Sequence, residues 1–135
     1  MSADEYTIAL IQHRLERART TLRDAHNLRA TDGSPVSIVN RSYYAMFYAA
    51  LALLASVDID TSKHTGVLSL FITMFIKTKI LPVEMSKMLR KAFDVRQMAD
   101  YEDNANVNME QAEQILKFAE QFIKTAEEKL SQENK

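Results

Sequence analysis

Residues 35–56 read PVSIVNRSYYAMFYAALALLAS, and this stretch decides the fold class. Pro35 suits the first turn of a helix, where its missing N–H costs nothing, and Ser34 before it supplies an N-cap hydroxyl. From Tyr43 onward the stretch is apolar nearly all round, as is typical of a helix that other helices surround. The apolar run 43–55 is shorter than the about 20 residues that a membrane-spanning helix needs, so it predicts a buried helix.

The rest of the 135-residue chain has the same helical character. It contains only two glycines and two prolines, which are too few for the frequent turns of a β-rich fold. Apolar residues recur three and four positions apart in four further stretches, which predicts helices at 4–29, 63–79, 83–99 and from Asn108 nearly to the C-terminus. Asn108 stands three residues before Gln111, a variant of the capping box. We therefore predict an all-α protein, a four- to five-helix antiparallel bundle.

Length and composition limit the classes of function. A chain of 15.4 kDa predicts one domain over residues 1–135, with a frayed tail at about 131–135. The absence of cysteine excludes thiol nucleophiles and thiolate zinc sites, and no metal or cofactor is expected. Seventeen basic and eighteen acidic residues give a net charge of −1, which argues against attachment to nucleic acid or membrane by bulk charge. The acidic N-terminus does not resemble a signal peptide, so we expect a cytoplasmic protein.

The first predicted helix is rich in arginine. It carries five of the eight arginines in the chain, namely Arg14, Arg17, Arg19, Arg23 and Arg29. Such residues could face RNA, because arginine binds phosphate in a bidentate manner. They are spread around the helix and alternate with acidic residues, so we interpret them as a solvated face.

A cation and two phenols share one side of the helix at 35–56. Arg41, Tyr44 and Tyr48 occupy positions i, i+3 and i+7, which places them on the same face of an otherwise buried helix. Buried polar groups need partners. These three side chains therefore either tie the helix to its neighbours or form part of a nucleotide- or RNA-binding site.

Three segments carry a resemblance to a known family. They are residues 41–50 (RSYYAMFYAA), residues 63–67 (KHTGV), and Arg96 together with residues 99–101 (ADY). In this order and at these separations, the chain resembles the HEPN domain family, specifically its small stand-alone bacterial and archaeal subfamily. The resemblance implies an α-helical bundle that is often dimeric and often encoded beside a minimal nucleotidyltransferase as a toxin–antitoxin pair.

Many HEPN proteins are metal-independent endoribonucleases with an Arg followed, after four to six residues, by a His. In such chemistry a base activates the RNA 2′-hydroxyl, an acid protonates the leaving oxygen and the Arg stabilises the pentavalent phosphate. The matching arginine here is Arg96, and Tyr101, Glu102 and Asp103 stand where the histidine would fall. An unperturbed tyrosine is a poor base at neutral pH, although it can donate a hydrogen bond to a phosphate.

Two further features near these motifs have both a functional and a structural interpretation. His64 lies near a predicted helix N-terminus, where backbone N–H groups and Lys63 could hold a phosphate, but it could equally pack or cap the first turn. Arg96 and Asp100 are four residues apart, so they could form an internal ion pair. If both face a cleft, the same pair could orient Arg96 toward a nucleotide phosphate.

We consider three functions. The favoured one is a HEPN module that binds nucleotide or RNA and a partner protein, as part of a two-component toxin–antitoxin system with a minimal nucleotidyltransferase and as a homodimer. The second is an active ribonuclease toxin with a degenerate Arg-x4-Tyr motif, in which Tyr101 or His64 replaces the missing histidine. The third is a helical interaction protein without a nucleotide site. The candidate catalytic residues are Arg96, Tyr101 and Asp100, and the candidate nucleotide- or RNA-binding residues are Arg41, Tyr44, Tyr48, Lys63 and His64.

Overall fold

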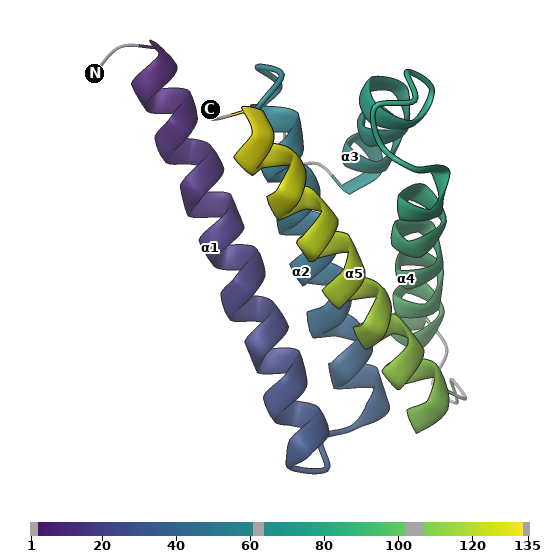
Figure 1. Cartoon of the computed structure of the whole chain (residues 1–135). Helices are drawn as coiled ribbons and strands as arrows, with labels where there is room; N and C mark the ends of the chain where they lie inside the picture. The colour runs from purple at the N-terminus through teal and green to yellow at the C-terminus, as the bar shows by residue number, and fades with distance from the viewer. Residues whose placement is uncertain (1–2, 61–63, 102–106, 134–135) are drawn as a thin grey trace.

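The structure is a computed structural model that describes the backbone of residues 3–60, 64–101 and 107–133. This part of the chain forms five α-helices and one π-helical turn and contains no strand, which confirms the all-α prediction (Figure 1). The elements are α1 (Ala3–Ala30), α2 (Pro35–Ala55), α3 (His64–Phe71), the π-helical turn η1 (Ile72–Ile76), α4 (Val83–Tyr101) and α5 (Met109–Glu133).

Helix α2 lies at the centre of the bundle. It contacts α1, α3, α4 and α5. Figure 1 shows that α1 runs antiparallel to α2 and α4 antiparallel to α5, whereas α2 and α5 run in the same direction. Fourteen of the 21 residues of α2 are buried, because its apolar side chains face neighbours on several sides. The prediction of a buried helix over 43–55 is confirmed.

The other helices close the core with aromatic side chains. Phe71 of α3, Phe75 of η1 and Phe122 of α5 are at most 1% exposed. The ring centroids of Phe71 and Phe122 lie 5.4 Å apart, a separation typical of favourable aromatic pairs. Phe122 therefore joins the C-terminal helix to the segment that follows α2.

Side-chain caps start two of the helices as the sequence predicts. The backbone N–H of Ser37 donates to Oγ of Ser34 at 3.1 Å, which satisfies one of the free donors at the start of α2. At α5, the N–H of Gln111 donates to Oδ1 of Asn108 at 2.8 Å. The N–H of Asn108 donates in return to Oε1 of Gln111 at 3.3 Å. The predicted capping box is confirmed.

The helix predicted over 63–79 is not one regular α-helix. α3 ends at Phe71 and widens into η1, where the N–H of Lys77 donates to the carbonyl of Ile72 at 2.9 Å, five residues back. The spacing of apolar residues cannot distinguish a π-helical turn from a regular α-helix, because one additional residue in a turn leaves the apolar positions on either side facing the core. Ser62, whose hydroxyl suits an N-cap directly before the predicted helix, lies outside the described residues.

Helices α4 and α5 extend beyond their predicted ends. α4 continues to Tyr101, so Asp100 is helical and not part of a loop. α5 continues through Glu133, into the segment expected to fray. No helix in the described part of the chain is long and apolar enough to cross a membrane.

The interpretation of the α1 arginines as a solvated face is wrong for Arg14. Its side chain is only 10% exposed, and its Nη1 donates to the backbone carbonyl of Leu51 at 3.1 Å. Its Nη2 donates to Oδ1 of Asp60 at 2.5 Å. Arg14 is buried because these two acceptors replace water around its guanidinium group.

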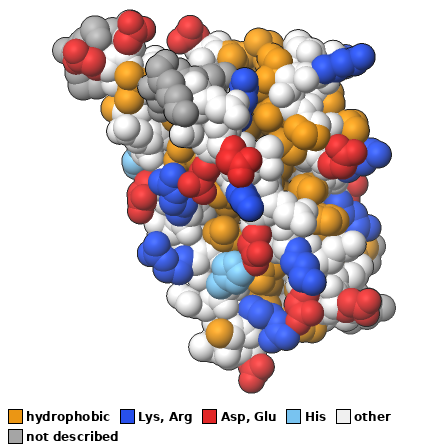
Figure 2. All heavy atoms as spheres, in the orientation of Figure 1, with side chains coloured by type: hydrophobic (Ala, Val, Ile, Leu, Met, Phe, Trp, Pro, Cys, Tyr) orange, Lys and Arg blue, Asp and Glu red, His pale blue; other side chains and the backbone are white. Residues whose placement is uncertain are grey.

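Other basic side chains of α1 contact acidic side chains of α5. Figure 2 shows blue and red side chains gathered on the face where these two helices lie. Nη2 of Arg19 lies 2.8 Å from Glu127, Nε2 of His26 lies 3.0 Å from Glu120, and Arg29 forms an ion pair with Glu113. These contacts cancel much of the positive charge on this face, which makes a broad RNA-binding surface there a poor interpretation.

Candidate functional site

Three tyrosines of α2 form an aromatic row beside α4 and α1. Tyr43 is buried, whereas Tyr44 and Tyr48 are half-buried at the edge of the bundle. Because successive helical residues point about 100° apart, Tyr43 faces inward while Tyr44 faces the rim. The ring centroids of Tyr43 and Tyr44 are 5.2 Å apart, and those of Tyr44 and Tyr48 are 6.1 Å apart. The row thus continues along one side of α2.

Arginines from three helices lie against these rings. The guanidinium carbon of Arg17 lies 4.4 Å from the ring centre of Tyr48, and that of Arg41 lies 5.3 Å from the ring centre of Tyr44. Both distances are within the range of cation–π attraction. The predicted alignment of Arg41, Tyr44 and Tyr48 is confirmed.

Arg96 of α4 completes the arrangement. Its guanidinium carbon lies 5.1 Å from the ring centre of Tyr43 and 5.3 Å from that of Tyr44. Its Nη2 lies 3.3 Å from Oδ2 of Asp100, which confirms the predicted i, i+4 ion pair. We name the whole set the arginine–tyrosine cluster: Arg17, Arg41, Tyr43, Tyr44, Tyr48, Arg96 and Asp100.

The guanidinium of Arg96 is held in place but has donors to spare. Its side chain is 19% exposed, so one part faces solvent while the rest packs on the tyrosines. Its buried Nε has no hydrogen-bond partner among the described residues. Buried donors are nearly always satisfied, so an unsatisfied one calls for an explanation. An external acceptor can therefore reach only the part of the guanidinium that faces solvent, which packing on the tyrosines has already fixed in place.

The cluster carries an excess of positive charge. Three guanidinium groups lie on its rings, and Asp100 supplies one carboxylate. Arg41 donates from Nε and Nη2 to Oδ1 of Asn40, at 3.1 and 2.8 Å. This amide oxygen orients Arg41 without neutralising it. An anion that approaches the cluster therefore meets a locally positive surface on a chain of nearly balanced charge.

Burial raises the pKa of Tyr43 from 10.0 to about 12. Desolvation is the largest cause, the positive charge of Arg96 opposes it, and the neighbouring Tyr44 adds to it. Tyr43 is therefore a neutral phenol at physiological pH and is unsuited to act as a base there. In the cluster it provides a ring on which Arg96 packs.

This pKa shift predicts a loss of stability at alkaline pH. The stability that neutral Tyr43 contributes is complete below pH 10, declines as the pH rises from 10 to 12 and is absent above 12, because the unfolded chain releases the proton first. Over this window the free energy of unfolding should fall by roughly 2 to 3 kcal/mol more in the wild type than in Tyr43→Phe. Urea unfolding at several pH values would measure the difference.

The control for this prediction is Tyr6→Phe, since Tyr6 is 57% exposed. In this variant the free energy of unfolding should decline between pH 10 and 12 as it does in the wild type. If Tyr43→Phe loses stability between pH 10 and 12 as steeply as the wild type, burial of the Tyr43 hydroxyl does not govern the alkaline transition.

Three predicted site residues cannot be placed in the cluster. Tyr101 is the last residue of α4, directly after Asp100, but its side chain lies outside the described residues. The side chain of His64, at the start of α3, is likewise outside them, as is all of Lys63. Within the described part of the chain, no group of three acidic or histidine side chains could hold a metal ion.

Two members of the cluster were not predicted from the sequence. In the sequence, Tyr43 is one member of a buried apolar run next to Tyr44, although a tyrosine in such a run offers its ring to a cation. The sequence pattern places Arg17 among the solvated arginines of the first helix. Its contact with Tyr48 depends on how α1 packs against α2, which no local pattern specifies.

The fold and the cluster define a class of protein: a small all-α bundle whose second helix presents tyrosines to arginines from its neighbours. The HEPN domain family model matches residues 11–129, and the chain belongs to this family. It is similar to "Putative toxin MJ0142" of Methanocaldococcus jannaschii, with 35% identity over 120 residues that cover 89% of this chain and 81% of the relative.

Two further relatives are named only as UPF0332 proteins. The one from Thermotoga maritima is 36% identical over 87% of this chain and 89% of its own length. The one from Gloeobacter violaceus is 33% identical over 90% of this chain and 96% of its own length. Similarity to small proteins over nearly their whole length confirms the subfamily expected from the sequence.

Proposed function

We propose that this chain is a toxin-like HEPN protein that binds RNA or a nucleotide through the arginine–tyrosine cluster and acts together with a partner protein. The toxin-like character rests on the name of the M. jannaschii relative and on the family. The RNA-binding role rests on the geometry of the cluster, and above all on one observation. Arg96 is fixed between two rings and a carboxylate while one part of its guanidinium faces solvent.

A phosphate group fits the donors that this arrangement offers. The planar guanidinium presents several N–H groups in a fixed geometry that matches two phosphate oxygens at once. Tyr43 and Tyr44 restrict the side chain of Arg96, so little conformational entropy is lost when the phosphate binds. Asp100 holds Nη2 at 3.3 Å and can keep the group oriented in the absence of ligand.

Single-stranded RNA also fits the half-buried rings. Tyr44 and Tyr48 lie at the rim of the bundle with Arg17 and Arg41 against them. Aromatic and guanidinium surfaces in a positive environment are the features on which unpaired bases stack. A strand crossing α2 could place its phosphates on the arginines and its bases on this rim.

The second candidate function is a metal-independent endoribonuclease. The observation that favours it is the same fixed cation, because an arginine in this state can stabilise a pentavalent phosphate. Proton transfer would then need Tyr101 or His64, since Tyr43 stays neutral with a pKa of about 12. Asp100 would act as a positioning residue for Arg96.

The proposal includes an assembly. By its resemblance to the HEPN subfamily, the chain would form a homodimer in the cytoplasm and pair with a nucleotidyltransferase antitoxin. A site composed across two chains could also supply the acid or base that one chain lacks.

The experiment that separates the two functions is an RNA cleavage assay in EDTA. Purified wild-type protein is incubated with labelled single-stranded RNA, and binding is followed by fluorescence anisotropy at about 50 mM salt, where phosphate contacts are strong. The favoured function predicts binding without cleavage. Cleavage that disappears in Arg96→Ala, Tyr101→Phe or His64→Ala, each checked for folding by circular dichroism, would identify a ribonuclease and the group that replaces the histidine.

If the protein neither binds nor cleaves RNA at high concentration, both functions are contradicted. If a folded Arg96→Ala variant binds RNA as strongly as the wild type does, the protein binds RNA at a site other than the arginine–tyrosine cluster. In that case Arg96 would act only as a link between α2 and α4, and its replacement should lower the melting temperature markedly.

A further inference from the structure

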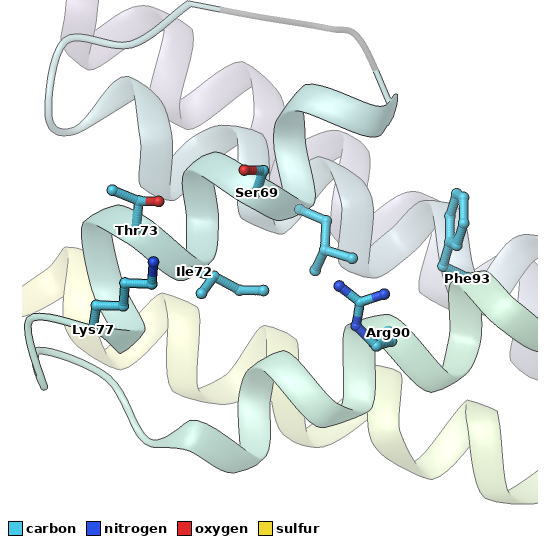
Figure 3. A pocket seen from close by; sticks show the side chains of 7 residues that line it. Ser69, Ile72, Thr73, Lys77, Arg90 and Phe93 are labelled. Atoms are coloured by element: carbon cyan, nitrogen blue, oxygen red, sulfur yellow. The ribbon is translucent and has the colours of Figure 1, made fainter.

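A polar hollow lies between the α3–η1 segment and α4. Its volume is about 310 Å³, near the lower end of the range for small-molecule sites. Side chains from both segments line it, as Figure 3 shows: Leu68, Ser69, Ile72, Thr73, Lys77, Arg90 and Phe93.

The π-helical turn builds one wall of this hollow. Ser69, Thr73 and Lys77 are four residues apart, and η1 inserts an additional residue into the turn between them. In an α-helix, residues at this spacing are rotated progressively around the helix axis, and the wider turn offsets that rotation. Two hydroxyls and one ammonium group therefore line the same wall. Single π-turns of this kind occur frequently at functional sites.

The opposite wall contributes a second cation. In Figure 3 the guanidinium of Arg90 points from α4 into the space between the two segments. Neither Arg90 nor Lys77 forms an ion pair or a side-chain hydrogen bond within the described part of the chain, whereas Arg14, Arg19 and Arg29 each contact a carboxylate. Among the described residues, no acidic side chain lines the hollow. Two like charges that share a hollow without a counter-charge favour a bound anion.

The remaining lining is apolar. Leu68, Ile72 and Phe93 are half-buried and offer hydrophobic surface beside the cations. Phe93 also packs on Tyr43 of the cluster, with ring centroids 5.9 Å apart, although the lining of the hollow shares no residue with the cluster. A ligand that satisfies the whole lining has an anionic group with several acceptor oxygens and a body with an apolar face.

We infer that this hollow binds the terminal phosphate of a mononucleotide, either free or at the 5′ end of an RNA chain. A phosphomonoester carries about −1.5 to −2 charges at pH 7, which matches Lys77 and Arg90 better than the single charge of an internal phosphodiester does. The hydroxyls of Ser69 and Thr73 donate to the remaining oxygens, and the nucleoside lies against Phe93. The site is separate from the arginine–tyrosine cluster, so it does not depend on the proposed function.

Calorimetric titration of the purified full chain with 5′-AMP, adenosine and inorganic phosphate tests the inference. We expect 5′-AMP to bind and adenosine to bind at least tenfold more weakly, because only the former engages the cations. Inorganic phosphate should bind more weakly than 5′-AMP, because it lacks the apolar body. The double variant Lys77→Gln/Arg90→Gln should lose at least tenfold in affinity for 5′-AMP. Lys77 and Arg90 are exposed, as are the two lysines of the control variant described next, so both variants should keep the wild-type melting temperature.

The matched control is Lys87→Gln/Lys91→Gln, which removes the same charge from positions of α4 that line a different hollow. It should keep wild-type affinity for 5′-AMP. Equal binding of 5′-AMP and adenosine, or equal affinity in the double variant and its control, would overturn the inference.

A second arm identifies the source of the phosphate. Labelled RNA with a 5′-phosphate is compared with the same RNA bearing a 5′-hydroxyl. A preference for the phosphorylated strand that disappears in Lys77→Gln/Arg90→Gln assigns the site to RNA ends. Binding of 5′-AMP without such a preference assigns it to free nucleotides.

Discussion

Arg96→Gln should weaken the binding of single-stranded RNA by roughly 10- to 100-fold and leave the helical content unchanged. The variant removes charge-assisted hydrogen bonds to phosphate, which contribute about 1.5 to 3 kcal/mol. Arg96→Lys keeps the charge but not the planar fork, so its affinity should lie between those of the wild type and Arg96→Gln. Fluorescence anisotropy with an RNA of about 12 nucleotides measures all three proteins under the same conditions.

Arg23→Gln is the control for charge alone. Arg23 is exposed on α1 and forms no ion pair within the described residues, so the substitution removes the same charge away from the cluster. It should change RNA affinity by less than about threefold at moderate salt, because distant surface charges are screened. Equal losses in Arg23→Gln and Arg96→Gln would mean that RNA responds to net charge and not to the arginine–tyrosine cluster.

The second large effect concerns the core. Phe122→Ala should lower the free energy of unfolding by about 3 to 5 kcal/mol, because it deletes a fully buried ring and leaves a cavity. This is a large part of the 5 to 15 kcal/mol that is typical of a small domain. Phe122 contacts Phe71, so the loss should loosen the attachment of α5 to α3. Urea denaturation followed by circular dichroism measures the change.

Phe118→Ala is the matched comparison on the same helix. Phe118 is only partly buried, so its replacement should cost clearly less. If both variants lose the same stability, the packing of Phe122 against Phe71 is not a major contribution to the core.

The helical fold could be predicted because its signals are local. The scarcity of glycine and proline can be read directly from the composition. The Ser34 cap and the Asn108–Gln111 box each join residues three positions apart, and the structure confirms both caps. The π-helical turn could not be predicted, because its additional residue leaves the apolar spacing on both sides compatible with an α-helix. The burial of Arg14 could not be predicted either, because its partners Leu51 and Asp60 are 37 and 46 residues away.

In the candidate site, likewise, features within one helix could be predicted and contacts between helices could not. The i, i+3, i+7 spacing of Arg41, Tyr44 and Tyr48 and the i, i+4 spacing of Arg96 and Asp100 are properties of single helices, so they could be predicted. The contact of Arg96 with the α2 tyrosines requires α4 to lie beside α2, and the contact of Arg17 with Tyr48 requires the observed packing of α1. The resemblance to the HEPN family pointed to Arg96, and the structure adds the rings that hold it.

The measurement that tests the central claim most directly is the NMR signal of the Arg96 side-chain Nε–H in ¹⁵N-labelled protein during titration with single-stranded RNA. The signal is assigned by its loss in Arg96→Lys, and the Nε–H of Arg19, which donates to Glu127 at 3.1 Å, serves as an internal reference. The account predicts a saturable shift of the Arg96 signal while that of Arg19 stays in place, because the phosphate changes the hydrogen bonding of the Arg96 guanidinium. An Arg96 signal that remains unchanged when the RNA is fully bound would contradict it.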